Sequence, residues 1–222
     1  MPIMDFLAQN ARLYPDETAL VEINPENGPR TEKWTEFSLV ETDPDKAYRR
    51  EISWADFDCR ANRFANLLLA HGVKKGDKVA ILLMNCLEWL PIYFGILRAG
   101  ALAVPLNYRY TAEEIKYCLE LSEASVLVFG PEFVERIESV RDELTNIRLM
   151  FYVGTKCPDY AMSYFKFILY CSSRNPSIPL TDEDFAAIYF SSGTTGFPKA
   201  ILHKHRSLMH AAMVEQAHHG QR

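Results

Sequence analysis

The stretch that decides the fold is residues 78–106, KVAILLMNCLEWLPIYFGILRAGALAVPL. Its first part, Lys78–Leu83, and its last part, Ala101–Leu106, are short and almost continuously apolar, as expected for buried strands. The segment between them, Leu87–Arg98, has the length and apolar spacing of a helix, and we expect Pro91 to bend its first turns. A strand, a helix and a second strand in this order predict a parallel pair joined by a crossover.

The same alternation continues on both sides of this stretch. Trp54 to Leu68 carries apolar residues at helical spacing after Ser53, and Thr111 with Glu114 forms a capping box for a further helix. Pro131 stands at the first position of another predicted helix. The remaining predicted strands are Val126–Phe129, Ile147–Val153 and Ala186–Phe190. The sequence therefore predicts an α/β fold, with a largely parallel sheet flanked by helices on both faces.

The N-terminal part has a different pattern. Residues 3–13 are amphipathic, and Thr18–Ile23 with Tyr48–Ser53 predicts an antiparallel hairpin around a long polar insert. We expect residues 1–53 to form this helix and hairpin, and residues 54–222 to form the sheet subdomain. The segment 154–180 has no clear period.

Composition excludes several classes of protein. The 222 residues are 48% hydrophobic and 24% charged, as in an ordinary soluble protein, and the net charge of −5 argues against nucleic acid as a partner. The five cysteines form no C-x-x-C pair, which favours reduced thiols in a cytoplasmic protein. The sequence shows no secretory signal, transmembrane segment or complete metal-ligand set, and it carries no indication of an oligomeric state.

The residues that point to chemistry follow the strand Ala186–Phe190. The loop reads Ser191-Ser192-Gly193-Thr194-Thr195-Gly196-Phe197-Pro198-Lys199. Glycines let backbone N–H groups approach phosphate oxygens, hydroxyls add donors, and lysine adds a compact positive charge. A surface turn without a ligand is the alternative interpretation of such a loop. The order Gly-Thr-Thr-Gly-x-Pro-Lys directly after a buried strand favours a polyphosphate site.

The segment from Ile188 to Lys199 resembles the phosphate-binding signature of the adenylate-forming superfamily, and further segments resemble this superfamily in order along the chain. They are residues 52–65, 73–81, 99–107, 110–115 and 122–127. The acyl-CoA synthetase branch is the most similar. The resemblance implies that residues 1–222 are the first part of the large N-terminal AMP-binding domain, without the C-terminal domain.

The resemblance also implies a reaction. A carboxylate attacks the α-phosphate of ATP to give an acyl-adenylate, and a thiol, usually that of coenzyme A, then takes the acyl group. The implied phosphate-binding residues are Ser191, Ser192, Gly193, Thr194, Thr195, Gly196 and Lys199. Mg²⁺ would share that task. Ala200 replaces a glycine common in relatives, and the catalytic residues are expected beyond Arg222, so we expect the isolated chain to be inactive.

Alternatives remain open within and outside this class. The acyl acceptor is coenzyme A or a carrier protein, the acid is a fatty or other apolar acid, and a non-catalytic nucleotide-binding fragment is a further possibility. The pair His203 and His205 is expected to have a structural role. The aromatic residues Tyr160, Tyr164, Phe165 and Phe167 are expected to pack in the core or to belong to a helix lying across the sheet, rather than to line an acyl pocket.

Overall fold

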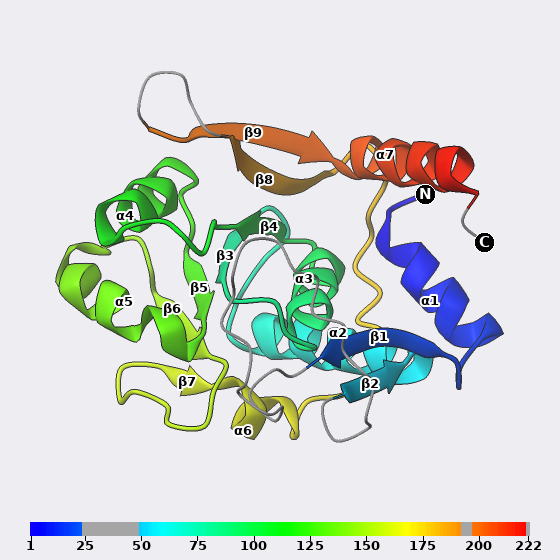
Figure 1. The fold of residues 1–222 in the computed structure, drawn as a ribbon, viewed down its shortest axis with the longest axis horizontal. Helices are drawn as coiled ribbons and strands as arrows, with labels where there is room; N and C mark the ends of the chain where they lie inside the picture. The colour runs from blue at the N-terminus through cyan, green and yellow to red at the C-terminus, as the bar shows by residue number, and fades with distance from the viewer. Residues whose placement is uncertain (24–48, 192–196, 221–222) are drawn as a thin grey trace, which may run out of the picture.

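The computed structural model describes residues 1–23, 49–191 and 197–220. Its centre is a sheet in the order β7-β6-β5-β3-β4-β8-β9, with helices packed on both faces (Figure 1). The strands of this sheet are β3 (Lys78–Leu82), β4 (Leu102–Pro105), β5 (Val126–Phe129), β6 (Leu149–Tyr152), β7 (Met162–Ser163), β8 (Phe185–Ser191) and β9 (Lys199–Lys204). Every neighbouring pair is parallel except β8 with β9, which confirms the predicted α/β class.

The helices lie in two layers. The helices longer than one turn are α1 (Met4–Leu13), α2 (Trp54–Ala70), α3 (Trp89–Arg98), α4 (Ala112–Leu121), α5 (Val134–Val140), α6 (Tyr164–Ile168) and α7 (His205–His219). Val79 and Ile81 of β3 pack in the same cluster as α2 and α3, whereas Ala80 and Leu82 pack with α4 and α5. Because successive side chains point to opposite faces, a strand covered on both faces must be apolar at every position. The continuous apolar run at residues 79–83 has this cause.

The N-terminal helix and hairpin are present as predicted. β1 (Thr18–Ile23) pairs antiparallel with β2 (Arg49–Ser53), and α1 places Met4 and Leu7 in the core. Phe6 of the same helix is 38% exposed. The predicted insert between these strands lies outside the described residues.

Two local predictions are wrong for identifiable reasons. Helix α3 begins at Trp89, so Pro91 lies in the first turn, where a missing N–H group costs no intrahelical hydrogen bond. Pro131 opens a 3₁₀ turn, η3 (Pro131–Phe133), and the α-helix starts only at Val134. A strand that the sequence did not predict, β9, follows the Ser191–Lys199 loop. A second 3₁₀ turn, η4 (Arg141–Glu143), follows α5.

Helices α2 and α3 approach each other closely at Gly95, with a buried polar group near the end of the contact. The Arg98 side chain is only 2% exposed and donates to the Asp58 carboxylate at 2.5 Å and to Asn62 Oδ1 at 2.7 Å. It also donates to the Asp58 carbonyl oxygen at 3.1 Å. The partners of its two terminal nitrogens therefore all belong to α2, whereas its Nε–H has no partner among the described residues.

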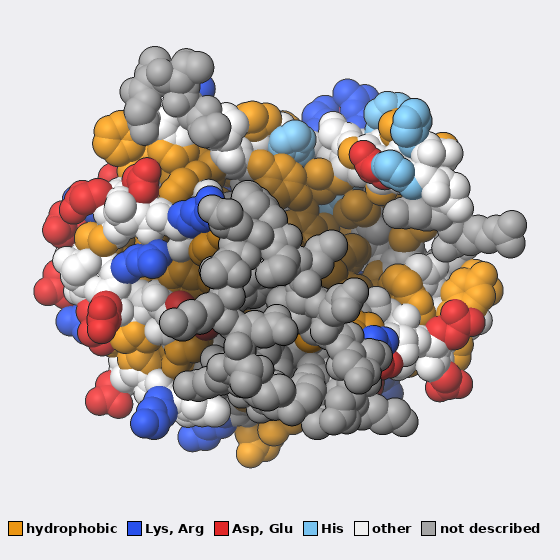
Figure 2. All heavy atoms as spheres, in the orientation of Figure 1, with side chains coloured by type: hydrophobic (Ala, Val, Ile, Leu, Met, Phe, Trp, Pro, Cys, Tyr) orange, Lys and Arg blue, Asp and Glu red, His pale blue; other side chains and the backbone are white. Residues whose placement is uncertain are grey.

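The final strand and helix are the least covered elements. β9 exposes Ile201 and Leu202, and His205 is the one residue of α7 that is buried. Figure 2 shows histidine side chains on the outer surface where Figure 1 places α7. None of the helices in the described part of the chain is long and apolar enough to cross a membrane.

Candidate functional site

The β8–β9 hairpin brings the two ends of the predicted loop together. Ser191 is the last residue of β8 and Lys199 the first residue of β9, and they are direct partners in the antiparallel register. Side chains of directly opposite residues lie on the same face of a sheet, with Cβ atoms about 4.5–5.5 Å apart. The Ser191 hydroxyl and the Lys199 side chain therefore emerge together at the base of the turn.

The rest of the predicted binding loop cannot be placed in the same way. Ser192, Gly193, Thr194, Thr195 and Gly196 lie outside the described residues. Their role in binding phosphate stays a prediction from the sequence.

The orientation of Tyr189 identifies the face of the sheet on which Ser191 and Lys199 lie. The Tyr189 hydroxyl is 2.7 Å from the hydroxyl of Tyr93 on α3, so Tyr189 points towards the α2 and α3 layer. The alternation of side chains along β8 then places Ser191 on this side of the sheet. Burial raises the pKa of Tyr93 above its usual value, as it does for Tyr189, so both hydroxyls stay protonated at neutral pH.

The returning end of the loop is anchored on the other layer of helices. The ring of Phe197 is 54% exposed but lies 4.8 Å from the ring of Tyr117 on α4, measured between centroids. Pro198, next along the chain, is buried. The packing of Phe197 and Pro198 therefore fixes the backbone just before β9 begins at Lys199.

The charge of Lys199 is open to an external anion. Lys199 is exposed, and no carboxylate among the described residues lies within ion-pairing distance of its ammonium group. Farther along, Lys204 contacts Glu183 at 2.8 Å and Arg206 contacts the same carboxylate at 2.6 Å. Lys204 and Arg206 therefore already have a carboxylate partner, and Lys199 is the lysine of β9 that is available to a ligand.

Ser191 and Lys199, the described ends of the loop, also lie at the edge of the sheet where ligands of α/β proteins are usually found. The chain passes from β3 to α3 on one face and from β4 to α4 on the other, which makes the β3–β4 pair a topological switch point. β8 is the parallel neighbour of β4, so the Ser191 end of β8 opens at the same carboxyl edge. Crevices at such an edge are common binding sites.

The histidines and acidic residues form no metal centre within the described part of the chain. No group of three histidine, cysteine or carboxylate side chains comes close enough there to hold an ion. His203 lies on β9 with its ring 5.1 Å from Tyr189, and His205 is buried at the start of α7.

Sequence reasoning missed the two aromatic contacts that position the hairpin. The Tyr93–Tyr189 hydrogen bond joins α3 to β8, and the Tyr117–Phe197 contact joins α4 to the loop. A signal for the first was present, because Tyr189 is two residues before Ser191 and must share its face. The second pairs residues far apart in the chain, and no local pattern indicates it.

Comparison with known families matches nearly the whole chain to one of them. The family described as AMP-binding enzyme matches residues 7–222. A 3-hydroxybenzoate–CoA/4-hydroxybenzoate–CoA ligase of Thauera aromatica is 35% identical over 172 residues, which are 77% of this chain and 33% of that protein. A crotonobetaine/carnitine–CoA ligase of Salmonella agona is 34% identical over 169 residues, covering 73% of this chain and 32% of the relative.

Solved structures are similar in the same way. The anthranilate CoA ligase AuaEII in complex with anthranoyl-AMP superposes with a TM-score of 0.81 at 27% identity, over 96% of this chain and 36% of that one. ATP-bound MatB from Rhodopseudomonas palustris has a TM-score of 0.64 at 29% identity, over 76% and 32% of the two chains. The chain thus spans about a third of the length of the relatives it matches.

Proposed function

The chain belongs to the family of AMP-binding enzymes, and from that premise we propose that its protein joins a carboxylic acid to coenzyme A at the expense of ATP. The family is that of adenylate-forming CoA ligases, and the two curated relatives described above are CoA ligases. This chain would supply the residues that hold the phosphates of ATP.

The proposed reaction has two balanced steps. A carboxylate oxygen attacks the α-phosphorus of ATP, a new P–O bond forms, and the bond to the β-phosphate breaks to release pyrophosphate. The thiol of coenzyme A then attacks the acyl carbon, AMP leaves with the carboxylate oxygen, and the thiol proton passes to solvent or a base. Negative charge accumulates on the departing pyrophosphate, so fixed donors and cations around it stabilise the first transition state.

The observation that carries the proposal is the position of Lys199. Its ammonium group has no carboxylate partner among the described residues, and it emerges opposite the Ser191 hydroxyl at the base of the loop. We propose that Lys199 and Ser191 bind the β- and γ-phosphates with Ser192, Gly193, Thr194, Thr195 and Gly196. A lysine acts on phosphate as a compact charge that needs no fixed orientation.

The relatives' names support coenzyme A as the acceptor over a carrier protein. Ligases named for hydroxybenzoate and anthranilate are among them, beside one named for crotonobetaine and carnitine. From the first two we propose an acid with an apolar body, aromatic or aliphatic. The five cysteines are all unpaired thiols, which supports a reducing compartment such as the cytoplasm.

Binding of inorganic tripolyphosphate and of ATP to the 222-residue chain tests the phosphate site. Lys199→Ala should weaken both ligands about tenfold or more, because charge-assisted hydrogen bonds contribute about 1.5–3 kcal/mol each. Lys204→Ala is the matched control, since Lys204 is on the same strand but is paired with Glu183. Equal affinities for the two variants would refute the site.

The division of the protein into parts is a further proposal. We propose that residues 1–222 form part of the large N-terminal domain, with residues 1–53 as helix and hairpin and 54–222 as sheet subdomain. The adenine, ribose and magnesium sites and the catalytic lysine would then lie outside this chain. The chain alone should bind ATP but show no ATP–pyrophosphate exchange, and measurable exchange would contradict this assignment.

A further inference from the structure

The end of α6 and the turn after it expose hydrophobic side chains at the lower edge of the molecule. Leu169 and Tyr170 are 67% and 86% exposed, the two highest values among the large hydrophobic residues that the structure describes, and Phe165 is 41% exposed. Figure 1 places α6 at this edge, and Figure 2 shows hydrophobic side chains there. Single exposed apolar residues are common, whereas a contiguous group of them is typical of an interaction surface.

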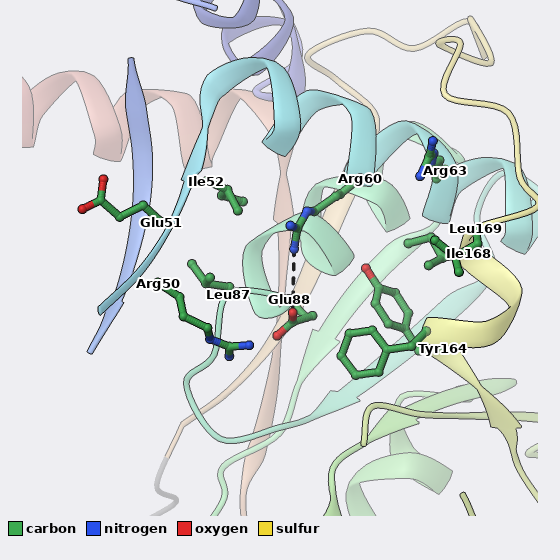
Figure 3. Close-up of a pocket in the computed structure, with 11 residues that line it drawn as sticks. Arg50, Glu51, Ile52, Arg60, Arg63, Leu87, Glu88, Tyr164, Ile168 and Leu169 are labelled. Carbon is green, nitrogen blue, oxygen red and sulfur yellow. Dashed lines mark ion pairs between the residues drawn. The ribbon is translucent and has the colours of Figure 1, made fainter. Parts of the chain in front are cut away.

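The three exposed side chains lie together. Leu169 still has helical backbone angles, so it stands one turn after Phe165 on the same face of α6. Both residues line one cavity with Arg63 of α2, and Figure 3 shows Leu169 near Arg63. Tyr170 follows directly in the chain. We call Phe165, Leu169 and Tyr170 the α6 patch.

Buried anchors hold the α6 patch in place. Tyr164 and Ile168 of the same helix are buried in the core. After the patch, the side-chain amide of Asn66 on α2 donates to the carbonyl oxygens of Ser172 and Arg174, both at 2.8 Å. The segment is therefore fixed on both sides of the patch, and it loses little conformational freedom when the patch meets a partner.

The backbone of the turn has its donors satisfied within the protein. The N–H of Tyr170 donates to the carbonyl oxygen of Phe167 at 3.2 Å, and the N–H of Cys171 donates to that of Ile168 at 3.3 Å. Moving a polar group out of water is costly only when the group is left without a hydrogen bond. The turn can therefore enter a medium that is poorer in water than the solvent.

Basic residues without carboxylate partners border the α6 patch. The segment 154–180 holds three basic residues and one acidic residue, Asp159, in a chain whose net charge is −5. Lys166 and Arg174 of this segment are exposed. Within the described part of the chain, no carboxylate lies within ion-pairing distance of Lys166, Arg174 or Arg63. This part of an acidic protein is therefore locally positive.

The carboxylates of the neighbouring cavity do not cancel this charge. Two of them line the cavity beside α6, and each forms an ion pair with an arginine: Glu51 with Arg49, and Glu88 with Arg60. These pairs add no net charge. The α6 patch is thus an apolar surface bordered by uncompensated positive charge.

We propose that the α6 patch binds the surface of a membrane that contains anionic lipids. The apolar side chains enter the headgroup region, and Lys166 and Arg174 meet the lipid phosphates. Tyr170 suits this interface because its ring is apolar and its hydroxyl is polar. A second copy of the chain would be a poorer partner, since a two-fold contact brings the unpaired cations of both copies together. Figure 1 shows α6 and β9 at opposite edges of the molecule, so the surface is separate from Lys199 and independent of ATP chemistry.

Co-sedimentation of the 222-residue chain with lipid vesicles tests the proposal. The chain should bind saturably to vesicles of equal parts phosphatidylglycerol and phosphatidylcholine, and about tenfold or more weakly to pure phosphatidylcholine. High salt should weaken the binding, because it screens the charges. Lys166→Gln with Arg174→Gln should reduce affinity about twentyfold, at about fivefold for each lost cation. Leu169→Ser with Tyr170→Ser should reduce it about tenfold, because the apolar contact is lost.

Two variants elsewhere on the surface are matched controls. Met213→Ser with Val214→Ser removes two consecutive exposed hydrophobic side chains from α7, and Arg12→Gln removes an exposed cation from α1. Both should leave vesicle binding unchanged. All the substituted side chains are exposed, so each variant should keep the melting temperature of the parent and its binding can be compared directly.

Three results with vesicles would overturn the proposal: no saturable binding to anionic vesicles, equal binding to neutral vesicles, or unaltered binding of both patch variants. Sedimentation velocity without lipid gives a further check. A dimer that dissociates when Leu169→Ser and Tyr170→Ser are introduced would make a second copy of the chain the partner of this surface, and would overturn the proposal as well.

Discussion

Replacing Gly95 by alanine tests the close contact between α2 and α3. A Cβ atom at this position would lie 2.8 Å from the backbone carbonyl oxygen of Ala61 and 3.0 Å from Cβ of Phe64. Both neighbours are fully buried, and neither is the end of a flexible side chain, so the helices themselves must move apart.

Two opposing contributions determine how much Gly95→Ala changes the free energy of unfolding. Overpacking of a dense core costs about 1–3 kcal/mol, and the cost should be at the upper end here because one contact is with backbone. Alanine in place of glycine inside a helix returns about 1 kcal/mol. We therefore expect Gly95→Ala to lower the free energy of unfolding by about 1–2 kcal/mol. For a chain of this size, each kcal/mol corresponds to about 2–4 °C in melting temperature.

Urea denaturation followed by circular dichroism measures this difference, with thermal melting as a second readout. Gly130→Ala is the control, since its new Cβ would meet the carboxylate end of Glu132 at 2.8 Å, and that side chain can rotate away. Gly130 also has a φ of −102°, which alanine adopts freely. A Gly95→Ala protein as stable as the parent, or a control that loses as much stability, would refute the packing argument.

Three further substitutions have defined expectations. Asp58→Asn leaves the Arg98 charge without its carboxylate, and urea denaturation should show a loss of about 2 kcal/mol in the free energy of unfolding. This is less than the roughly 3–5 kcal/mol expected for a fully buried pair, because the Asp58 side chain is 23% exposed. An unchanged free energy of unfolding would mean that the remaining acceptors of Arg98 suffice. Burial lowers the pKa of His205 below 6.5, so the unfolded chain binds a proton that the folded chain does not, and stability should fall as the pH drops below about 6.5. His205→Gln should flatten this part of the stability–pH curve, and an unchanged slope would assign it to other groups. Thr111→Ala removes the reciprocal capping box with Glu114 and should cost about 1 kcal/mol, measured by thermal melting against the exposed Ser139→Ala.

Elements with a strong local pattern could be predicted from the sequence. Val126–Phe129 and the strand of residues 18–23 have the predicted bounds, and the Thr111 capping box is present in both directions. These features depend on hydrophobic periodicity and on hydrogen bonds within one turn, which neighbouring residues determine.

Features that depend on contacts distant in sequence could not be predicted. β9 was missed because its exposed residues lack the alternation of a half-buried strand, and its existence depends on pairing with β8. Tyr164 was expected in the core, and it is there, but the lack of a partner for its hydroxyl among the described residues follows only from the packing of α6 near α2. Ser191 and Lys199 were identified by residue type, whereas their direct pairing required the register.

The two outer strands of the sheet differ in what they offer to another chain. β7 is only two residues long, whereas β9 has six residues, and among the described residues no strand pairs with its outer side. An outer strand with free N–H and C=O groups is a template for adding another strand. Ile201 and Leu202 of β9 are 45% and 48% exposed, so this edge is also hydrophobic and prone to association. Self-association of the isolated chain should therefore start at β9. The substitution Ile201→Lys should reduce this association in concentrated solution, because a lysine on an edge strand disfavours pairing with another strand.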